Sequence, residues 1–233
     1  MTLQELTEKL KDESLASGLE LITNLYSGKV VFSSAFGQED QAITHAIFKN
    51  DLDVKIFTLD TGRLFKETYD LIDQTRSRYK KTIEVFYPQT EKVQQLVSEK
   101  GMHSFYNSVE ERKECCFIRK VEPLQRALKG ADVWITGLRS SQSANREGFK
   151  QLEWDEQNKV IKYNPILDWS YDELIKYLTD HNVPYNKLHD QGFISIGCAP
   201  CTRAITTGED PRAGRWWWES SQKECGLHQL AKV

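Results

Sequence analysis

Residues 29–40, KVVFSSAFGQED, carry the pattern from which the fold class is predicted. Its first half is short, apolar and rich in β-branched residues, which predicts a buried strand. The strand runs directly into small and polar residues. A helix is predicted next, because Ala42, Ile43, Ala46 and Ile47 share one apolar face. A buried strand, a polar loop and a helix in this order are the repeating unit of a parallel α/β sheet.

The rest of the chain repeats this alternation. Strands are predicted at 54–59, 82–87 and 132–137, helices at 2–26, 64–79, 90–100, 114–128 and 170–181, and a hairpin at 150–163. We therefore predict an α/β fold with a mostly parallel sheet and helices on both faces. The chain is expected to form a single domain over 1–233. Residues 1–27 would be a helical lead, and residues 203–233 a mobile C-terminal tail with a catalytic role.

Composition and charge argue against several classes of protein. The chain has 233 residues, of which 39% are hydrophobic and 28% charged, as in ordinary soluble domains. Its 31 basic and 34 acidic residues give a net charge of −3, so no global positive field suggests a nucleic-acid partner. No membrane span is expected, because no apolar run reaches about 18 residues. The charged N-terminal segment does not resemble a signal peptide, and we expect a cytoplasmic protein.

Two predicted loops follow strands at the edge where parallel sheets bind ligands. In the first, Ser33, Ser34 and Gly37 are small enough to let a phosphate approach, although a Walker motif is missing. The second is the turn Asp60-Thr61-Gly62, whose side chains could hydrogen-bond a ribose or an adenine. Each also has a simpler interpretation, as a polar turn or as a helix cap with a turn glycine.

The five cysteines divide into two pairs and a remainder. Cys115 and Cys116 are adjacent, and Cys198 and Cys201 form a C-x-x-C pair. Four thiolates suit zinc or an iron–sulfur cluster. Neighbouring helical residues diverge by about 100°, which strains coordination of one small ion and suits the separate irons of a cubane cluster better. A redox dithiol and an absence of any metal are the other interpretations.

The remaining cysteine, Cys225, lies in the segment ECGLH, residues 224–228. A cysteine in a polar, glycine-containing tail is expected to be accessible and can serve as a nucleophile. His228, three residues later, could lower the pKa of its thiol. The alternative is an idle terminal thiol, and the sequence alone leaves both interpretations open.

Several basic residues are candidates for binding an oxyanion, because forked arginine donors match tetrahedral anions. They are Lys120, Arg139, Arg146, Arg203, Arg212 and Arg215. Isolated basic residues are usually solvated, so the glycine-containing turn at 212–215 is the stronger candidate. The three tryptophans at 216–218 are interpreted as packing residues rather than as a base-stacking platform.

Seven motifs together resemble one known family. They are CC at 115–116, RKVEPL at 119–124, LHDQGF at 188–193, IGCAPCT at 196–202, GED at 208–210, AGRW at 213–216 and ECGLH at 224–228. The combination resembles the assimilatory sulfonucleotide reductases, and within them the iron–sulfur adenylyl-sulfate (APS) reductases. The resemblance extends from about residue 28 to 228.

This resemblance implies an adenine-nucleotide alpha-hydrolase-like fold that binds the nucleotide through the 33–40 loop and the turn at 60–62. It implies a [4Fe-4S] cluster on the two cysteine pairs and makes Cys225 the nucleophile. Lys120 matches a lysine that lies between cluster and substrate in the family. Arg139, Arg212, Arg215 and His228 match positions around the phosphosulfate. Many members carry a further arginine after the equivalent of Arg139, and Arg146 is the candidate to replace it.

The resemblance also implies a reaction. APS would be reduced to sulfite and AMP, through a cysteine S-sulfonate, with thioredoxin as reductant in assimilatory sulfate reduction. The nearest alternative substrate is 3′-phospho-APS (PAPS), alone or together with APS, although reductases restricted to PAPS usually lack the two cysteine pairs. More distant alternatives are an ATP-pyrophosphatase-type ligase or thiolation enzyme and a non-catalytic zinc protein. The oligomeric state is open, a homo-oligomer included.

Overall fold

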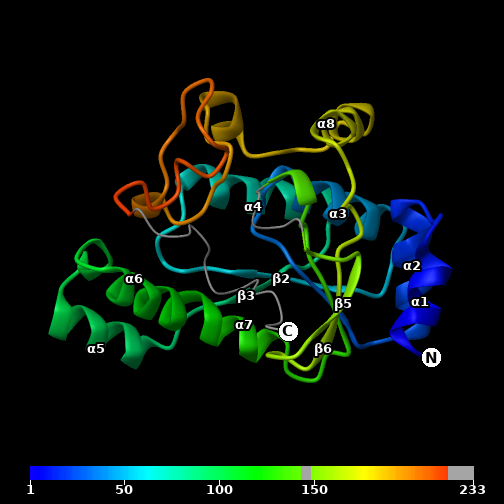
Figure 1. Cartoon of the computed structure of the whole chain (residues 1–233), viewed down its shortest axis with the longest axis horizontal. Helices are drawn as coiled ribbons and strands as arrows, with labels where there is room; N and C mark the ends of the chain where they lie inside the picture. The colour runs from blue at the N-terminus through cyan, green and yellow to red at the C-terminus, as the bar shows by residue number, and fades with distance from the viewer. Residues whose placement is uncertain (143–147, 220–233) are drawn as a thin grey trace.

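A six-stranded sheet forms the centre of the computed structural model, which describes residues 1–142 and 148–219 (Figure 1). The strand order is β3-β2-β1-β4-β6-β5. The strands are β1 (Val30–Ser33), β2 (Lys55–Leu59), β3 (Glu84–Phe86), β4 (Val133–Ile135), β5 (Leu152–Asp155) and β6 (Val160–Tyr163). Four neighbouring pairs are parallel, and β5 pairs antiparallel with β6 as the expected hairpin. The predicted mostly parallel sheet is confirmed.

Helices cover both faces of the sheet, as predicted (Figure 1). They are α1 (Leu3–Leu10), α2 (Leu15–Leu25), α3 (Gln38–Lys49), α4 (Lys66–Tyr79), α5 (Thr90–Lys100), α6 (Val109–Cys116), α7 (Glu122–Ala127) and α8 (Tyr171–Asp180). Strand β1 contributes to both cores because successive side chains point to opposite faces. Val30 and Phe32 lie in the core cluster of α1 to α4, whereas Val31 clusters with Leu124 of α7. Within the described residues, no helix is long and apolar enough to cross a membrane.

The strand order reverses at β1. Strands β2 and β3 lie on one side of β1, and β4, β6 and β5 lie on the other. At such a switch point the loops that follow the two central strands diverge, which leaves a crevice at the carboxyl ends of the strands. Ser34, after β1, and Thr136 and Gly137, after β4, line a cavity at this position. The fold therefore places the loop predicted from residues 33–40 at a binding crevice.

Two predicted helices are wrong in their extent. The single helix expected over 2–26 is two helices, because Ser14 caps the start of α2 by accepting a hydrogen bond from the Ser17 N–H. The helix expected over 114–128 begins earlier, at Val109, and is interrupted by a π-helical turn, Phe117–Val121. Pro123 follows this turn near the start of α7 and lacks the N–H that a continuous helix would use.

A buried histidine lies where α8 packs on α3. His45 of α3 is 6% exposed, and its Nδ1 lies 2.8 Å from the Tyr79 hydroxyl. Its ring stacks on His181, just after α8, with centroids 5.0 Å apart. Burial, together with the nearby His181, Lys49 and Arg78, lowers the pKa of His45 to about 4. The imidazole is therefore neutral in the folded protein at neutral pH.

This depressed pKa makes stability depend on pH. The unfolded chain binds a proton at His45 near pH 6.5, whereas the folded chain resists it down to about pH 4. The free energy of unfolding should therefore fall as the pH decreases from 6.5 to 4, by up to about 3 kcal/mol. Urea titrations of wild type and His45→Gln across this range measure the effect, and the variant should show a shallower slope. His103→Gln, at an exposed position, is the control. Equal slopes for wild type and His45→Gln would contradict the assignment.

Candidate active site

A large cavity occupies the switch point at the carboxyl ends of β1 and β4. Its volume is about 820 Å³, which lies in the range of sites for nucleotide-sized ligands. Most of the binding residues predicted from the sequence line it: Ser33, Ser34, Gly37, Lys120, Arg139, Arg212 and Arg215. They come from the β1 loop, the π-helical turn, the β4 loop and the glycine-containing turn at 212–215. The structure thus brings together residues that are as much as 182 positions apart in the sequence.

Asp40 organises the loop after β1. Its Oδ2 accepts hydrogen bonds from the backbone N–H of Ala35, at 2.7 Å, and of Gly37, at 3.4 Å. The Ser34 hydroxyl accepts a third, from the N–H of Phe36. These amides are therefore used within the loop, unlike those of phosphate-binding loops, which point at the ligand. The cations of the cavity, rather than this set of amides, are left as the main groups for an anionic ligand.

The turn Asp60-Thr61-Gly62 lies beside the cysteines rather than in the lining of the large cavity. The Asp60 carboxylate accepts hydrogen bonds from the Gly62 N–H and the Tyr69 hydroxyl. The Thr61 hydroxyl lies 3.2 Å from the Cys198 sulfur, and its carbonyl accepts a hydrogen bond from Arg119. A contact between this turn and a nucleotide stays a prediction.

Arg139 is held in place by an acidic partner. Its Nε donates to Glu39 at 2.9 Å, and both side chains are largely buried, at 6% and 13% exposure. Its Nη1 also donates to the Ser141 hydroxyl. A buried guanidinium with these partners is rigid and partly neutralised. An anion at this end of the cavity would therefore meet an ion pair rather than a bare cation.

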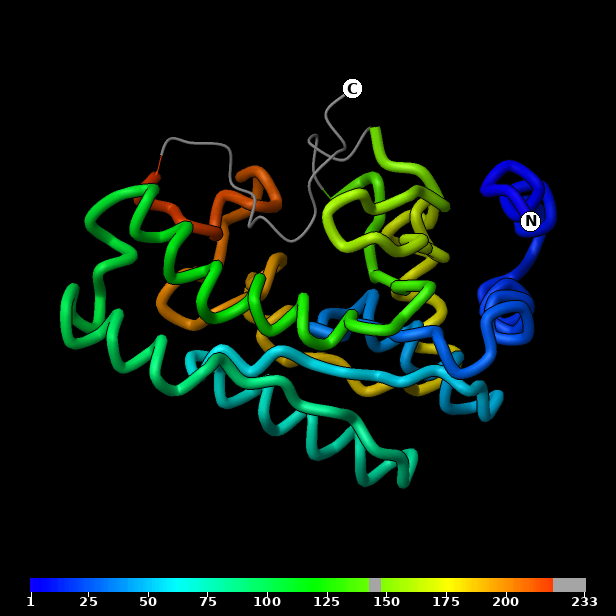
Figure 2. The backbone as a smooth tube through the Cα atoms, turned by 90° about the horizontal axis from the view of Figure 1, so that it is seen from below, coloured from blue at the N-terminus to red at the C-terminus, as the bar shows by residue number. Residues whose placement is uncertain are grey.

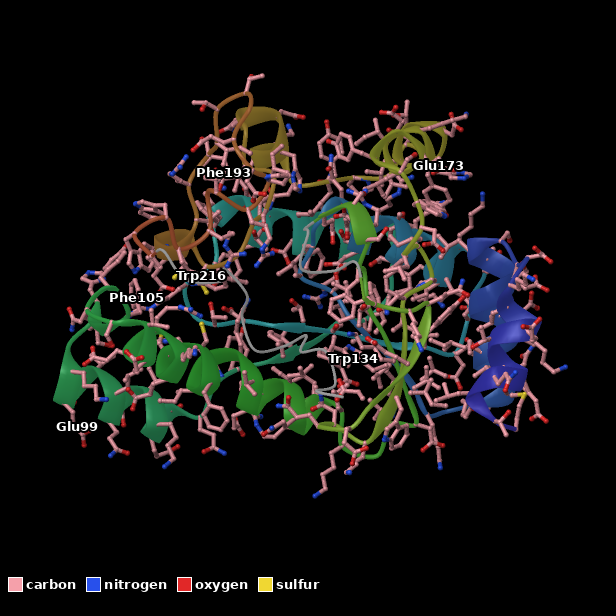
Figure 3. All side chains as sticks on the ribbon, in the orientation of Figure 1. Glu99, Phe105, Trp134, Glu173, Phe193 and Trp216 are labelled. Carbon is pink, nitrogen blue, oxygen red and sulfur yellow. The ribbon has the colours of Figure 1, made fainter. Side chains whose placement is uncertain are left out.

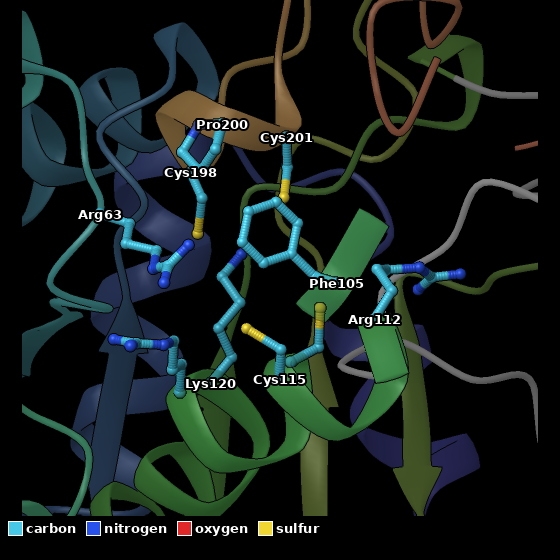
Figure 4. Close-up of a pocket in the computed structure, with 10 residues that line it drawn as sticks. Arg63, Phe105, Arg112, Cys115, Lys120, Cys198, Pro200 and Cys201 are labelled. Carbon is cyan, nitrogen blue, oxygen red and sulfur yellow. The ribbon is translucent and has the colours of Figure 1, made fainter. Parts of the chain in front are cut away.

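The two cysteine pairs meet in a second, smaller cavity next to the first (Figure 4). Cys115 and Cys116 end α6, and Cys198 and Cys201 belong to the turn at 198–201. In Figure 4 the sulfurs of Cys198 and Cys201 point from one side of this cavity toward that of Cys115 on the other. All four are free thiols. Nevertheless, within the described residues no three Cys, His, Asp or Glu side chains form a group suited to a single metal ion.

The surroundings of the cysteines favour protonated thiols over thiolates unless a bound group adds positive charge. Burial raises the pKa of the Cys201 thiol to about 12, and the neighbouring cysteines add to this effect. Burial raises the pKa of Cys115 too, whereas Arg119 and Arg63 oppose the shift. A metal centre would reverse this balance, because coordinated thiols lose their protons.

Lys120 connects the two cavities. It lies in the π-helical turn after Cys116 and lines both the small cysteine cavity and the large one. Arg215 makes a second link: it lines the large cavity, and its Nε lies 3.3 Å from the Cys201 carbonyl oxygen. A ligand in the large cavity would therefore have its anionic end close to the cysteines.

Some residues of the site were not predicted from the sequence. Arg63 and Phe105 line the cysteine cavity in a cation–π pair at 4.8 Å, and His189 lines the large cavity. Glu39 and Asp40, which also line it, belong to the predicted 33–40 loop but were not singled out as site residues. Asp40 had a detectable signal, because an acidic residue at the third position of a helix commonly forms a capping interaction. Three predicted residues, Arg146, Cys225 and His228, lie outside the described residues.

The fold and these cavities define a class: parallel α/β proteins with a ligand crevice at the switch point, here next to a four-cysteine centre. The sequence model of the family described as "Phosphoadenosine phosphosulfate reductase domain" matches residues 29–204. The chain belongs to this family.

Named relatives agree with this membership. The chain is 48% identical to adenosine 5′-phosphosulfate reductase of Allochromatium vinosum over 92% of this chain and 85% of the relative. It is 52% identical to the enzyme of the same name from Burkholderia cepacia, over 86% and 80%. The structure is similar to phosphoadenylyl-sulfate reductase from Candida auris, with a TM-score of 0.73 and 28% identity over 87% and 96%. Yeast FAD synthetase, at a TM-score of 0.58 and 14% identity over 86% and 67%, shares the fold alone.

Gly137, after β4, packs against Asp40 of the loop that follows β1. A Cβ atom there would lie 2.2 Å from Oδ1 of Asp40 and 3.3 Å from the Asp40 backbone nitrogen. Gly137→Ala should therefore displace the residue that closes the loop and lower the free energy of unfolding by about 1–3 kcal/mol. Urea denaturation measures this change, and an unchanged m-value is the control that the same cooperative unit unfolds. A midpoint equal to that of wild type would show that the loop is looser than its contacts indicate.

Proposed function

We propose that this protein reduces adenylyl sulfate to sulfite and AMP, with Cys225 as nucleophile and thioredoxin as reductant. The observation that carries the proposal is the position of Lys120, which lines both the large cavity and the cysteine cavity. The names of the relatives, adenosine 5′-phosphosulfate reductases at about half identity, support the same substrate. Assimilatory sulfate reduction, in the cytoplasm, is the process we infer.

The substrate would lie with its nucleotide at the β1 loop and its phosphosulfate toward Lys120. Ser33, Ser34 and Gly37 line the cavity at the first position, and Arg212 and Arg215 line the same cavity. Because Glu39 already pairs with Arg139, Lys120 and the arginines at 212 and 215 would supply most of the positive charge for the anion. The turn at 60–62 and His228 remain proposed contacts of the substrate.

The proposed chemistry has two thiol steps. The Cys225 thiolate attacks the sulfur atom of the sulfate, a sulfur–sulfur bond forms, and the bond from sulfur to the phosphate oxygen breaks. AMP leaves with the electron pair of that bond, and its phosphate charge is stabilised by the cations of the cavity. A thioredoxin thiolate then attacks Sγ of Cys225 and releases sulfite, and the second thioredoxin thiol resolves the mixed disulfide. Thioredoxin thus supplies both electrons. We place Cys225 on a catalytic tail, residues 203–233.

The four cysteines fit a [4Fe-4S] cluster better than a single zinc ion. They are gathered round one cavity, yet they form no compact single-ion site within the described residues. We propose that Cys115, Cys116, Cys198 and Cys201 hold the cluster. When bound, it would position and polarise the groups beside the sulfate rather than carry electrons. Lys120 is then the residue that faces the cluster and the substrate at once.

PAPS, alone or beside APS, is the alternative substrate with a specific basis, since the Candida auris relative is named a phosphoadenylyl-sulfate reductase. The pair of cysteine motifs favours APS. An ATP-pyrophosphatase-type ligase or thiolation enzyme is less favoured, because Asp40 uses loop amides that a pyrophosphate group would need.

The nucleophile is tested by Cys225→Ser. A hydroxyl is a far weaker nucleophile than a thiolate at neutral pH, so sulfite release should fall below detection. AMP binding, measured by calorimetry, should stay within about twofold of wild type because the cavity is unchanged. The matched control is Cys116→Ser, which should cost iron content as well as activity. Sulfite release by Cys225→Ser would refute the mechanism.

Substrate and cluster are tested on one anaerobic preparation. We expect a brown protein with about four iron and four sulfide per chain, which releases sulfite from APS with thioredoxin. Its kcat/KM for PAPS should be at least tenfold lower. Equal turnover of both nucleotides would identify a dual-substrate enzyme, and a colourless zinc-bearing protein would contradict the cluster. ATP-dependent release of AMP would instead support the ligase alternative.

A further inference from the structure

Residues 215–219 join the two parts of the chain that carry the cysteine pairs. In Figure 2 this segment, in red, lies beside the green helical region that contains α6. Its backbone is bonded to the turn of the second cysteine pair. The backbone N–H of Trp216 donates to the Cys201 carbonyl at 3.3 Å, and Thr202 forms an antiparallel bridge with Arg215. We call residues 215–219 the anchor segment.

The ring of Trp216 packs against residues of both parts. It is 1% exposed and shares an apolar cluster with Phe105, Cys115 and Cys201 (Figure 3). Arg112 of α6 lies over the ring, at 4.5 Å from its centroid. Burial of this ring favours contact between α6 and the anchor segment, but apolar burial is not directional and does not by itself fix how the two parts are oriented.

A buried ion pair supplies a directional link between the same two parts. Arg112 donates from Nε to Oε1 of Glu219 at 2.8 Å and from Nη2 to Oε2 at 2.9 Å. The two side chains are 2% and 4% exposed. The backbone N–H of Glu219 in turn donates to the Trp216 carbonyl, which ties the carboxylate to the anchor segment. Two parallel, desolvated hydrogen bonds fix distance and orientation more closely than the exposed ion pairs of this protein do.

Arg112 is also next to the first cysteine pair. It lies one turn before Cys116 on α6 and interacts with that thiol, and both residues line the cysteine cavity, where Figure 4 labels Arg112. One guanidinium therefore contacts a cysteine of the first pair and an acid that is attached to the turn of the second pair.

A further hydrogen bond joins the two parts, and it is the weaker link. The Tyr106 hydroxyl donates to the Pro200 carbonyl at 2.7 Å. Tyr106 is 40% exposed, and a neutral hydrogen bond in contact with water contributes less than a buried, charged one. Of these two links, the ion pair is the one expected to set the position of α6 relative to the anchor segment.

We propose that Arg112 and Glu219 are positioning residues for the four-cysteine centre. Their ion pair holds α6 against the anchor segment, so that the two cysteine pairs face one cavity before any cluster is bound. A site that is already assembled loses less conformational freedom when it binds its ligand. The pair itself supplies no ligand to the cluster. This inference rests on the proposed function in one respect, that the four cysteines hold the cluster.

The test uses the double variant Arg112→Gln/Glu219→Gln. Both charges are removed together, because a single change would leave its partner charged and buried. Arg112→Lys is the conservative variant: it keeps the charge but loses the two-pronged geometry, so its effect should be intermediate. The matched control is Lys100→Gln/Glu114→Gln, which removes a solvent-exposed ion pair between α5 and α6.

Three quantities are measured on the full chain. The first is the rate at which a chelator removes iron from the cluster-bearing protein under anaerobic conditions. The second is cross-linking of the metal-free protein by dibromobimane, which joins two neighbouring thiols, in a Cys225→Ser background that leaves the four paired cysteines. Mass spectrometry separates cross-links between the pairs from those within the Cys198–Cys201 pair, which serve as internal standard. The third is the Kd for AMP, which reports on the large cavity.

In the double variant, we expect cross-links between the pairs to fall about fivefold or more relative to those within the Cys198–Cys201 pair, because the link that keeps the pairs close is gone. Iron should be lost about 10- to 100-fold faster, in line with the loss of metal affinity when residues that support the ligands are removed. AMP binding should stay within about twofold of wild type, because the large cavity is unchanged.

The proposal is overturned if cross-linking and iron release in the double variant match those of the control pair. It is overturned too if wild type gives no cross-links between the pairs, or if cross-linking within the Cys198–Cys201 pair and AMP binding fall in step with them. Should the double variant not fold, Arg112→Lys decides, and a wild-type ratio of cross-links in that variant would overturn the proposal. Failure of wild type to hold iron would instead overturn the proposed cluster, and cross-linking of the metal-free protein would still decide the role of the ion pair.

Discussion

Two cysteine pairs that lie far apart in the sequence meet at one cavity of the folded protein. Cys115 and Cys116 end a helix on one side of the sheet, whereas Cys198 and Cys201 belong to an irregular C-terminal region. Their common cavity joins these parts. It also places Lys120, which follows the first pair, at the border of the large cavity. Trp216 packs with Cys115 and Cys201 in one apolar cluster, which attaches the last described turns of the chain to α6.

Several charged side chains of the cavity at the switch point already have partners within the protein. Asp40 satisfies loop amides, and Glu39 neutralises part of Arg139. These internal partners keep the polar groups satisfied while the crevice is open, and they reduce the reorganisation needed when an anion enters. The positive charge that faces the cysteines comes from other positions, among them Arg63, Arg119 and Lys120. The site is therefore asymmetric. At one end, acidic side chains already pair with the loop amides and with Arg139, whereas the cations at the other end attract an anion.

Some elements could be predicted from local pattern and others could not. The alternation of apolar strands and amphipathic helices predicted the parallel sheet, because burial on both faces requires nearly continuous apolar strands. The boundary at Ser14 and the π-helical turn before Pro123 were missed. The Ser14 cap stabilises a new helix start by only about 1 kcal/mol. The π-helical turn depends on how α6 packs in the folded protein. Neither effect is visible in apolar periodicity.

Residue types and short spacings were enough to predict the α/β class, the division of the cysteines into pairs and four of the basic residues that line the large cavity. These depend on residue types and short spacings, which local chemistry governs. The folded structure was needed to show which charges are already paired, such as Arg139 with Glu39 and Arg112 with Glu219. These partners are about 100 residues apart, and their pairing depends on how the folded chain brings buried groups together. No local pattern encodes that proximity, because the cost of burying an unpaired charge arises only once the core has formed.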